Sequence, residues 1–133
     1  MKKILFVTAT LCILFSFSAC TKNEDKPEIL EWTQSEIYTD EEINSAIDVV
    51  CSEFRHWKGC KLETITYAGD EMSMERIDWA TQYDLDQSLV LISSFSTNNN
   101  PQESFEKNKT YDGYKWILAR NNDEKWHCVA NEF

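Results

Sequence analysis

The segment between residues 38 and 59 constrains the fold more than any other part of the chain, because it carries the start, the buried face and the stop of one helix. Thr39 and Glu42 have the spacing of a capping box, in which each side chain accepts a hydrogen bond from the other residue's backbone N–H. Gly59 supplies the stop. Between them, apolar residues recur at helical spacing: Ile43, Ala46, Ile47, Val50, Cys51, Phe54 and Trp57. The pattern predicts one long amphipathic helix over about residues 40–58 with a single buried face.

The chain after this helix alternates strand-like segments with turn signals. Strands are expected at residues 60–67, 89–95, 114–120 and 125–130. Ser73 can cap a short helix that runs to about Tyr83. A loop is expected over about residues 96–111, because no apolar period is present there. The order predicts an α+β fold, in which the long N-terminal amphipathic helix packs on a curved, mainly antiparallel four-stranded sheet, with one short extra helix.

The first 19 residues have the features of an export signal. Lys2 and Lys3 precede an apolar run that ends at Phe17 and is short for a membrane span. Ser18 and Ala19 then lead to Cys20. This stretch resembles the lipobox of bacterial lipoproteins, in which the cysteine receives the lipid, although Phe17 stands where a leucine is usual. The alternative is a secreted protein that is cleaved nearer Ser18.

The domain organisation follows from this interpretation. We expect a lipoprotein signal peptide at residues 1–19, a lipid-anchored polar linker at residues 20–34 and a single α+β domain at residues 35–133. The 114 residues after the signal are enough for one domain with a modest core. The expected location is therefore outside the cytoplasm, anchored by lipid to the cell membrane and facing outward.

The negative charge of the chain limits the classes of partner that it can bind. The formal net charge is −10, and without Lys2 and Lys3 the 23 acidic residues face 11 basic ones, which gives −12. An acidic protein is a poor ligand for nucleic acid and for anionic lipid head groups, so we expect membrane contact through the lipid anchor only. The acidic surface either favours cationic ligands or keeps an exported protein soluble. The expected partner is a protein or a small-molecule ligand.

Cysteine and histidine residues do not form a recognisable metal site. Cys51 lies on the apolar face of the predicted helix and His56 lies off it, while His127 and Cys128 are strand neighbours whose side chains point to opposite faces. We therefore expect no metal and no cofactor. Three cysteines remain after Cys20, at positions 51, 60 and 128, so at most one intramolecular disulfide can form.

Catalytic motifs are also missing from the sequence, which has no nucleophile elbow and no glycine-rich phosphate loop. Two aromatic pairs are the candidate binding surface: Trp79 with Tyr83, and Tyr111 with Tyr114 beside the long loop. The other tryptophans expected in the core are Trp57, Trp116 and Trp126. These features favour a binding surface over an active site.

Several stretches of residues 35–133 together resemble a group of small exported proteins of Gram-positive bacteria, a domain family without an assigned activity. They are Ile37–Ile43, Ala46–Asp48, Trp57–Leu62, Tyr67–Glu71, Asp78–Ala80 and Trp116–Asn121. The helix-plus-sheet order is similar to cystatin-like and NTF2-like folds, which host inhibitors, binding modules and a few enzymes. The resemblance itself implies little about function, and it is the absence of a catalytic motif that favours a non-enzymatic binding or accessory module. The alternative is an NTF2-like enzyme that acts on a small substrate in the concave face of the sheet.

Overall fold

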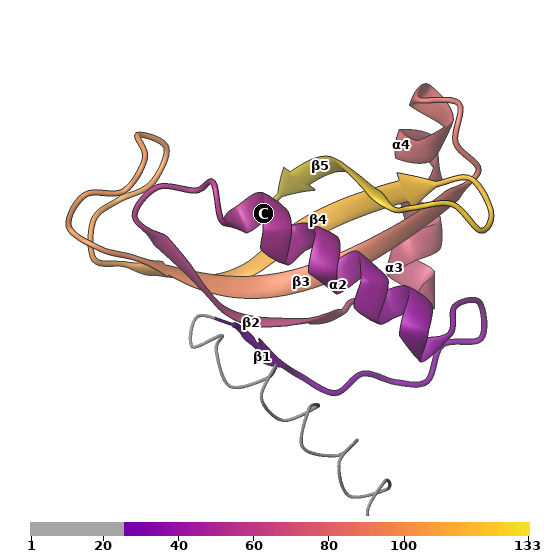
Figure 1. Cartoon of the computed structure of the whole chain (residues 1–133), viewed down its shortest axis with the longest axis horizontal. Coiled ribbons are helices and arrows are strands. Elements are labelled where there is room, and N and C mark those ends of the chain that lie inside the picture. The colour runs from indigo at the N-terminus through magenta and orange to yellow at the C-terminus, as the bar shows by residue number, and fades with distance from the viewer. Residues whose placement is uncertain (1–25) are drawn as a thin grey trace, which may run out of the picture.

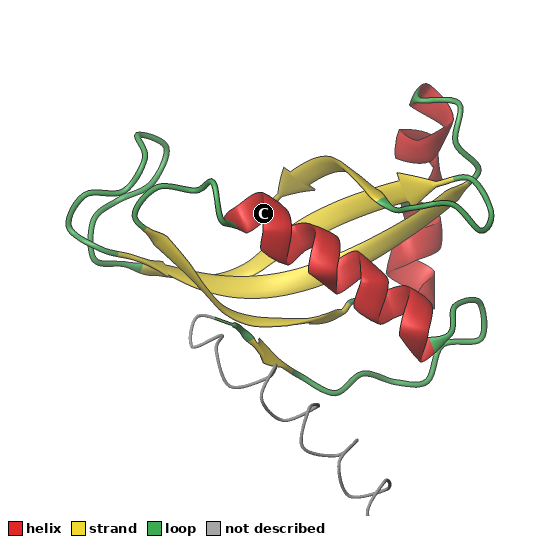
Figure 2. Ribbon diagram, viewed as in Figure 1, coloured by secondary structure: helices red, strands yellow, loops and turns green. Residues whose placement is uncertain are grey.

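A computed structural model describes residues 26–133, where one twisted sheet carries a helix across one face (Figure 1). The elements in chain order are β1 (Glu28–Ile29), α2 (Asp40–Phe54), β2 (Cys60–Tyr67), α3 (Asp70–Glu75), α4 (Ile77–Gln82), β3 (Gln87–Thr97), β4 (Thr110–Arg120) and β5 (His127–Glu132). The strands lie in the sheet in chain order, from β1 at one edge to β5 at the other. Figure 2 shows α3 and α4 together at one end of the sheet.

The capping box at the start of α2 is confirmed. The Glu42 carboxylate accepts from the Thr39 N–H at 2.9 Å, and the Glu42 N–H donates to Thr39 Oγ1 at 3.1 Å. The helix ends at Phe54 rather than near residue 58, because the N–H groups of His56 and Trp57 bond to carbonyls three residues back. That bonding tightens the chain into a turn that cannot continue an α-helix.

The main hydrophobic core fills the space between α2 and the sheet. Ile43 and Ile47 of α2 are at most 1% exposed, and Phe95 and Trp116 of the sheet are fully buried. The Trp116 indole N–H donates to Ser93 Oγ at 2.9 Å, so this large side chain is buried with its one polar atom satisfied. Side chains therefore occupy the face of the sheet on which an NTF2-like pocket was the alternative expectation.

A smaller buried set on the opposite face positions α3 and α4. Val90 and Ile117 are paired across β3 and β4 and fully buried, and they alternate with the residues of the main core. α3 contacts β3, and α4 contacts both strands. Ser73 of α3 fixes the contact, because its Oγ accepts the Val90 N–H at 2.9 Å while its carbonyl accepts the Ser88 hydroxyl at 2.6 Å.

The predicted fold class is wrong in several respects. The sheet has five strands rather than four, and it is mixed, because β1 pairs with β2 in parallel. Within residues 26–133 no long N-terminal helix is present, since α2 has only 15 residues. The sequence does not predict β1, because the strand is only two residues long and exposed. It joins the sheet through pairs such as Ile29 with Ile65. Residues 28–30, which the sequence alone places in the polar linker, thus pair with the sheet.

The single short helix expected between Ser73 and Tyr83 is in fact two helices. Arg76 separates α3 from α4 with backbone angles of φ −104° and ψ 18°, outside the helical region. α3 also begins earlier than predicted, after Gly69, whose φ of 111° suits only glycine. Of the helices within the described residues, none combines the length and apolarity that crossing a membrane requires.

The expected long loop is shorter than predicted and is fixed to the fold. β3 runs on to Thr97 and β4 starts at Thr110, which leaves residues 98–109. Phe105 stacks on Trp57 at 5.4 Å between ring centroids, and backbone bonds join Gln102 to Lys58 and the Asn98 N–H to the Gly59 carbonyl. The loop therefore packs on the turn between α2 and β2.

Gly59 is the tightest point of that contact and generates a stability prediction. Its φ is +70°, and a Cβ there would lie 2.5 Å from the Asn100 carbonyl oxygen. Gly59→Ala should lower the free energy of unfolding by about 1–2 kcal/mol for the left-handed backbone, plus about 1–3 kcal/mol for the clash. Gly113→Ala is the matched control, because φ is +71° and nothing lies within 4 Å. Equal losses in urea unfolding would show that the loop is not packed here.

Asp70 joins the segment before α2 to the start of α3. Its Oδ1 accepts the hydroxyls of Ser35 and Tyr67, both at 2.6 Å, and its Oδ2 accepts the Glu36 N–H at 2.8 Å. These hydrogen bonds, with that from Ser35 first, hold the pKa of the Asp70 carboxyl below its usual range. The charged form is therefore favoured in the folded chain.

This junction should give the folded state a defined acid sensitivity. Because the pKa of Asp70 is lower folded than unfolded, its contribution is complete above the unfolded pKa and is lost as pH falls through the folded value. At neutral pH, Asp70→Asn should cost about 1–3 kcal/mol, since hydrogen bonds to a charged group are replaced by weaker ones. Thermal unfolding from pH 7 to pH 3 should show the gap closing. A gap that stays constant with pH would contradict a charged role for Asp70.

Candidate functional site

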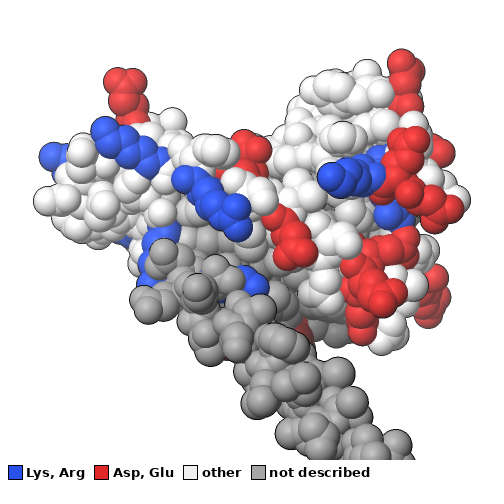
Figure 3. Space-filling view, viewed as in Figure 1, with Lys and Arg blue, Asp and Glu red and all other residues white. Residues whose placement is uncertain are grey.

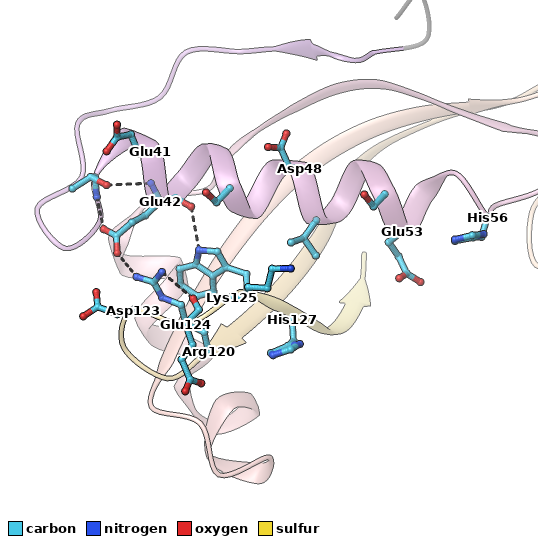
Figure 4. Close-up of a pocket in the computed structure, with 15 residues that line it drawn as sticks. Glu41, Glu42, Asp48, Glu53, His56, Arg120, Asp123, Glu124, Lys125 and His127 are labelled. Atoms are coloured by element: carbon cyan, nitrogen blue, oxygen red, sulfur yellow. Dashed lines mark hydrogen bonds and ion pairs between the residues drawn. The ribbon is translucent and has the colours of Figure 1, made fainter.

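A groove of about 850 Å³ lies between α2 and the hairpin that links β4 to β5 (Figure 4). One wall is the solvent-facing side of α2, and the other is formed by the hairpin and the start of β5. The lining residues are Thr39, Glu41, Glu42, Ser45, Asp48, Val49, Ser52, Glu53, His56, Arg120, Asp123, Glu124, Lys125, Trp126 and His127. Most of these side chains are polar and open to solvent.

Arg120 closes one end of the groove and holds its two walls together. The side chain is buried at the end of β4, and its Nη2 forms an ion pair with the Glu42 carboxylate of α2. Its Nε donates to Gln87 Oε1 at 2.7 Å, and its guanidinium lies 4.2 Å from the centre of the Trp126 ring. Trp126 in turn donates its indole N–H to the Glu42 carbonyl at 3.1 Å. A helix start, a strand end and the hairpin are thereby locked into one unit.

The contacts of Glu42 with Thr39 and Arg120 also determine its ionisation. The backbone N–H of Thr39 has the largest effect in lowering the pKa of the Glu42 carboxyl, and Arg120 lowers it further. Glu42 therefore stays ionised and neutralises Arg120, the buried cation of the groove.

The remaining charge in the groove is strongly negative. Glu41, Asp48 and Glu53 project from α2, and Asp123 and Glu124 lie on the hairpin. Lys125 is the lining cation left after Arg120 has been paired with Glu42. Carboxylates on both walls make this an acidic surface that attracts cationic groups.

Both histidines of the chain line the same groove, which the sequence did not predict. His56 follows α2, and His127 is the first residue of β5. Glu53, near the end of α2, lines the groove with them (Figure 4). All three are exposed. Within residues 26–133 no three His, Cys, Asp or Glu side chains are close enough to hold a metal ion. The chemistry that this arrangement offers is hydrogen bonding and proton transfer at an open surface.

The aromatic residues expected to form a binding surface lie in two separate places. Tyr114 is buried and donates its hydroxyl to Asn131 Oδ1 at 2.5 Å, and Tyr111 stacks on Phe95 with ring centroids 5.1 Å apart. On α4, Trp79 is half-buried, whereas Tyr83 is 54% exposed. No aromatic contact among the described residues joins the two pairs. Tyr83 is the one of the four with a mainly exposed ring.

The remaining predicted site residue is a cysteine. Cys20, the expected lipid site, lies outside the described residues. Cys51, Cys60 and Cys128 are free thiols, and none forms a disulfide. Burial raises the pKa of all three, to about 11 at Cys128. Their thiolates are disfavoured, so these cysteines act as small apolar side chains rather than nucleophiles.

Comparisons with models of protein families, with curated proteins and with solved structures found no match for this chain. The groove is therefore interpreted from its own residues.

The ion pair between Glu42 and Arg120 predicts where the groove is most sensitive. Glu42→Gln should lower the free energy of unfolding by about 2–4 kcal/mol, because it leaves the Arg120 guanidinium buried without its counter-charge. The control is Glu132→Gln, which breaks the more exposed pair with Arg76 and should cost less than about 1 kcal/mol. Chemical unfolding of both variants provides the measurement. Similar small losses would mean that Arg120 does not depend on Glu42.

Proposed function

We propose that this protein is an exported, lipid-anchored binding module without enzymatic activity, and that the groove between α2 and the β4–β5 hairpin binds a cationic segment of a partner. The signal-like residues 1–19 and Cys20 support export and anchoring. The groove supports binding, because its volume of about 850 Å³ lies within the range of ligand sites in proteins, about 300–1,000 Å³.

The observation that carries the proposal is the distribution of charge across the two walls. Glu53 on α2 points toward the start of β5, Asp48 lies at the solvent side of the same wall, and Asp123 and Glu124 lie on the hairpin opposite. Carboxylates that serve only to keep the protein soluble could lie anywhere on its surface. Here they line both walls of a groove, although the buried Arg120 in that groove is already neutralised by Glu42. A lysine or arginine side chain placed between the walls would meet carboxylates on both sides.

A second candidate function is that of an NTF2-like enzyme acting on a small substrate. Its active site would lie in the groove rather than in the concave face of the sheet. His56, His127 and Glu53 favour it, because a histidine and a carboxylate at one surface can exchange protons with a bound substrate. The binding module is the better supported of the two. The lining holds no activated cysteine, and its two histidines lie on an open surface from which water is not excluded.

A charge-matched pair of variants tests the binding proposal. A short oligolysine peptide, titrated by calorimetry at low ionic strength, should bind the intact protein. The double variant Asp48→Asn/Glu53→Gln should weaken binding about fivefold to thirtyfold, as expected for the loss of two ion pairs of up to about 1 kcal/mol each. Glu71→Gln/Glu75→Gln on α3 removes the same charge outside the groove and should change affinity far less.

Two outcomes would contradict this proposal. Equal weakening by both double variants would show that the peptide responds to net charge rather than to the groove. Turnover of a small ester or amide by the intact protein, lost in His127→Gln while peptide affinity is unchanged, would favour the enzyme.

A further inference from the structure

We propose that the β1 edge of the sheet, together with the turn after α2, docks on the anionic lipid surface that holds the anchor, so that the groove faces away from the membrane. This rests on the proposed lipidation of Cys20. The docking surface consists of Lys26, Ile29, Leu30, Arg55, Lys58 and Lys61.

The length of chain between the anchor and the sheet limits how far the domain can move. Seven residues separate Cys20 from Glu28, where β1 pairs with β2. Fully extended, they reach at most about 28 Å. A domain of this size is roughly 35 Å across. The tether is shorter than the domain that it holds, which keeps the β1 edge close to the lipid.

The surface next to that edge carries cations without partners. Lys26, Arg55, Lys58 and Lys61 are exposed, and none of them forms an ion pair with a residue in the described part of the chain. Lys26 and Arg55 both lie close enough to Cys51 for their charges to act against the rise that burial causes in the pKa of its thiol. Such side chains are attracted to anionic head groups within a Debye length, which is about 8–10 Å in physiological salt.

Apolar side chains are exposed at the same edge. Ile29 is 49% exposed and Leu30 is 38% exposed, although both lie in the short segment that pairs with β2. The two aliphatic side chains extend from opposite faces of the edge segment, so an edge-on approach of the sheet would bring both to the boundary between head groups and acyl chains.

The charge of the molecule is divided in a way that selects one orientation. Figure 3 shows most of the lysine and arginine side chains of this face toward the loop end of the domain, while aspartate and glutamate gather at the opposite end. The acidic end includes α3, which begins with Asp70 and Glu71, and the hairpin with Asp123 and Glu124. An anionic surface attracts the first region and repels the second. The groove borders β5, at the far edge of the sheet from β1.

In this orientation the domain itself, and not only its anchor, contacts the membrane. Net charge alone argues for membrane contact through the lipid anchor only, but the docking surface carries four exposed cations, which outnumber the exposed carboxylates of Glu28 in β1 and of Glu31 after it. The anchor and the docking surface would then act together, as two weak attachments joined by a short link do.

Lysine footprinting on vesicles tests the proposal with an internal control. The full chain, produced with its own signal in a bacterium, is reconstituted in vesicles of phosphatidylcholine alone or with phosphatidylglycerol. A brief pulse of an amine-reactive ester is followed by peptide mass spectrometry. On anionic vesicles, labelling of Lys26, Lys58 and Lys61 should fall at least threefold, while that of Lys125 in the groove stays unchanged. High salt should restore labelling at the three protected lysines.

A charge variant and the mass of the N-terminal peptide separate the possible failures. Lys58→Gln/Lys61→Gln should restore labelling at Lys26, whereas Lys125→Gln should leave its protection intact. A lipid-modified Cys20 with equal labelling of all lysines on both vesicles would refute the docked surface alone, and equal protection of Lys125 would refute the orientation. An unmodified Cys20 would refute the anchoring itself and with it this proposal.

Discussion

One carboxylate connects the local and the long-range structure of this protein. Glu42 completes the capping box of α2 by accepting the Thr39 N–H, and the same side chain pairs with Arg120, which is 78 residues away in sequence. The start of the helix is thereby fixed to the end of β4, while Trp126 closes over the pair from the hairpin. The position of α2 on the sheet, the shape of the groove and the orientation of the hairpin all depend on that contact.

The opposite end of the molecule is held by aromatic packing instead of charge. Trp57 contacts Phe54, Phe95 and Phe105, so the turn after α2, the middle of the sheet and the loop of residues 98–109 share one cluster. Ring pairs of this kind add to the burial of apolar surface. The loop is consequently part of the folded core, and shortening it would remove Phe105 from that cluster. Tyr111 and Tyr114, the aromatic pair expected to form a binding surface beside this loop, are packed into the same aromatic cluster through Phe95.

Local signals in the sequence were sufficient for some elements and not for others. The capping box and apolar face of α2 and the burial of Trp116 and Trp126 could be predicted, because each depends on neighbouring residues or on strong hydrophobicity. β1 could not, since two exposed residues carry no periodicity. The break at Arg76 has no glycine or proline to announce it in the sequence, and the two helices that it separates pack differently: α3 contacts β3, and α4 contacts both β3 and β4. The groove was missed for a related reason: its walls are far apart in sequence, and the one hint was a buried-strand arginine followed by an acidic turn.

The uneven distribution of charge explains how a strongly acidic chain can have two surfaces of different use. Net charge describes the field far from the protein, but within about 8–10 Å the sign is set by the nearest side chains. Near β1 they include Lys26 and Lys61, which form no ion pair with a residue of the described part of the chain, together with the exposed Glu28. Along α2 and the hairpin they are mainly carboxylates, and Glu42 is already paired with Arg120. A chain held by its N-terminus beside β1 presents the first surface to whatever holds it. The second is then left free for a partner that arrives from solution.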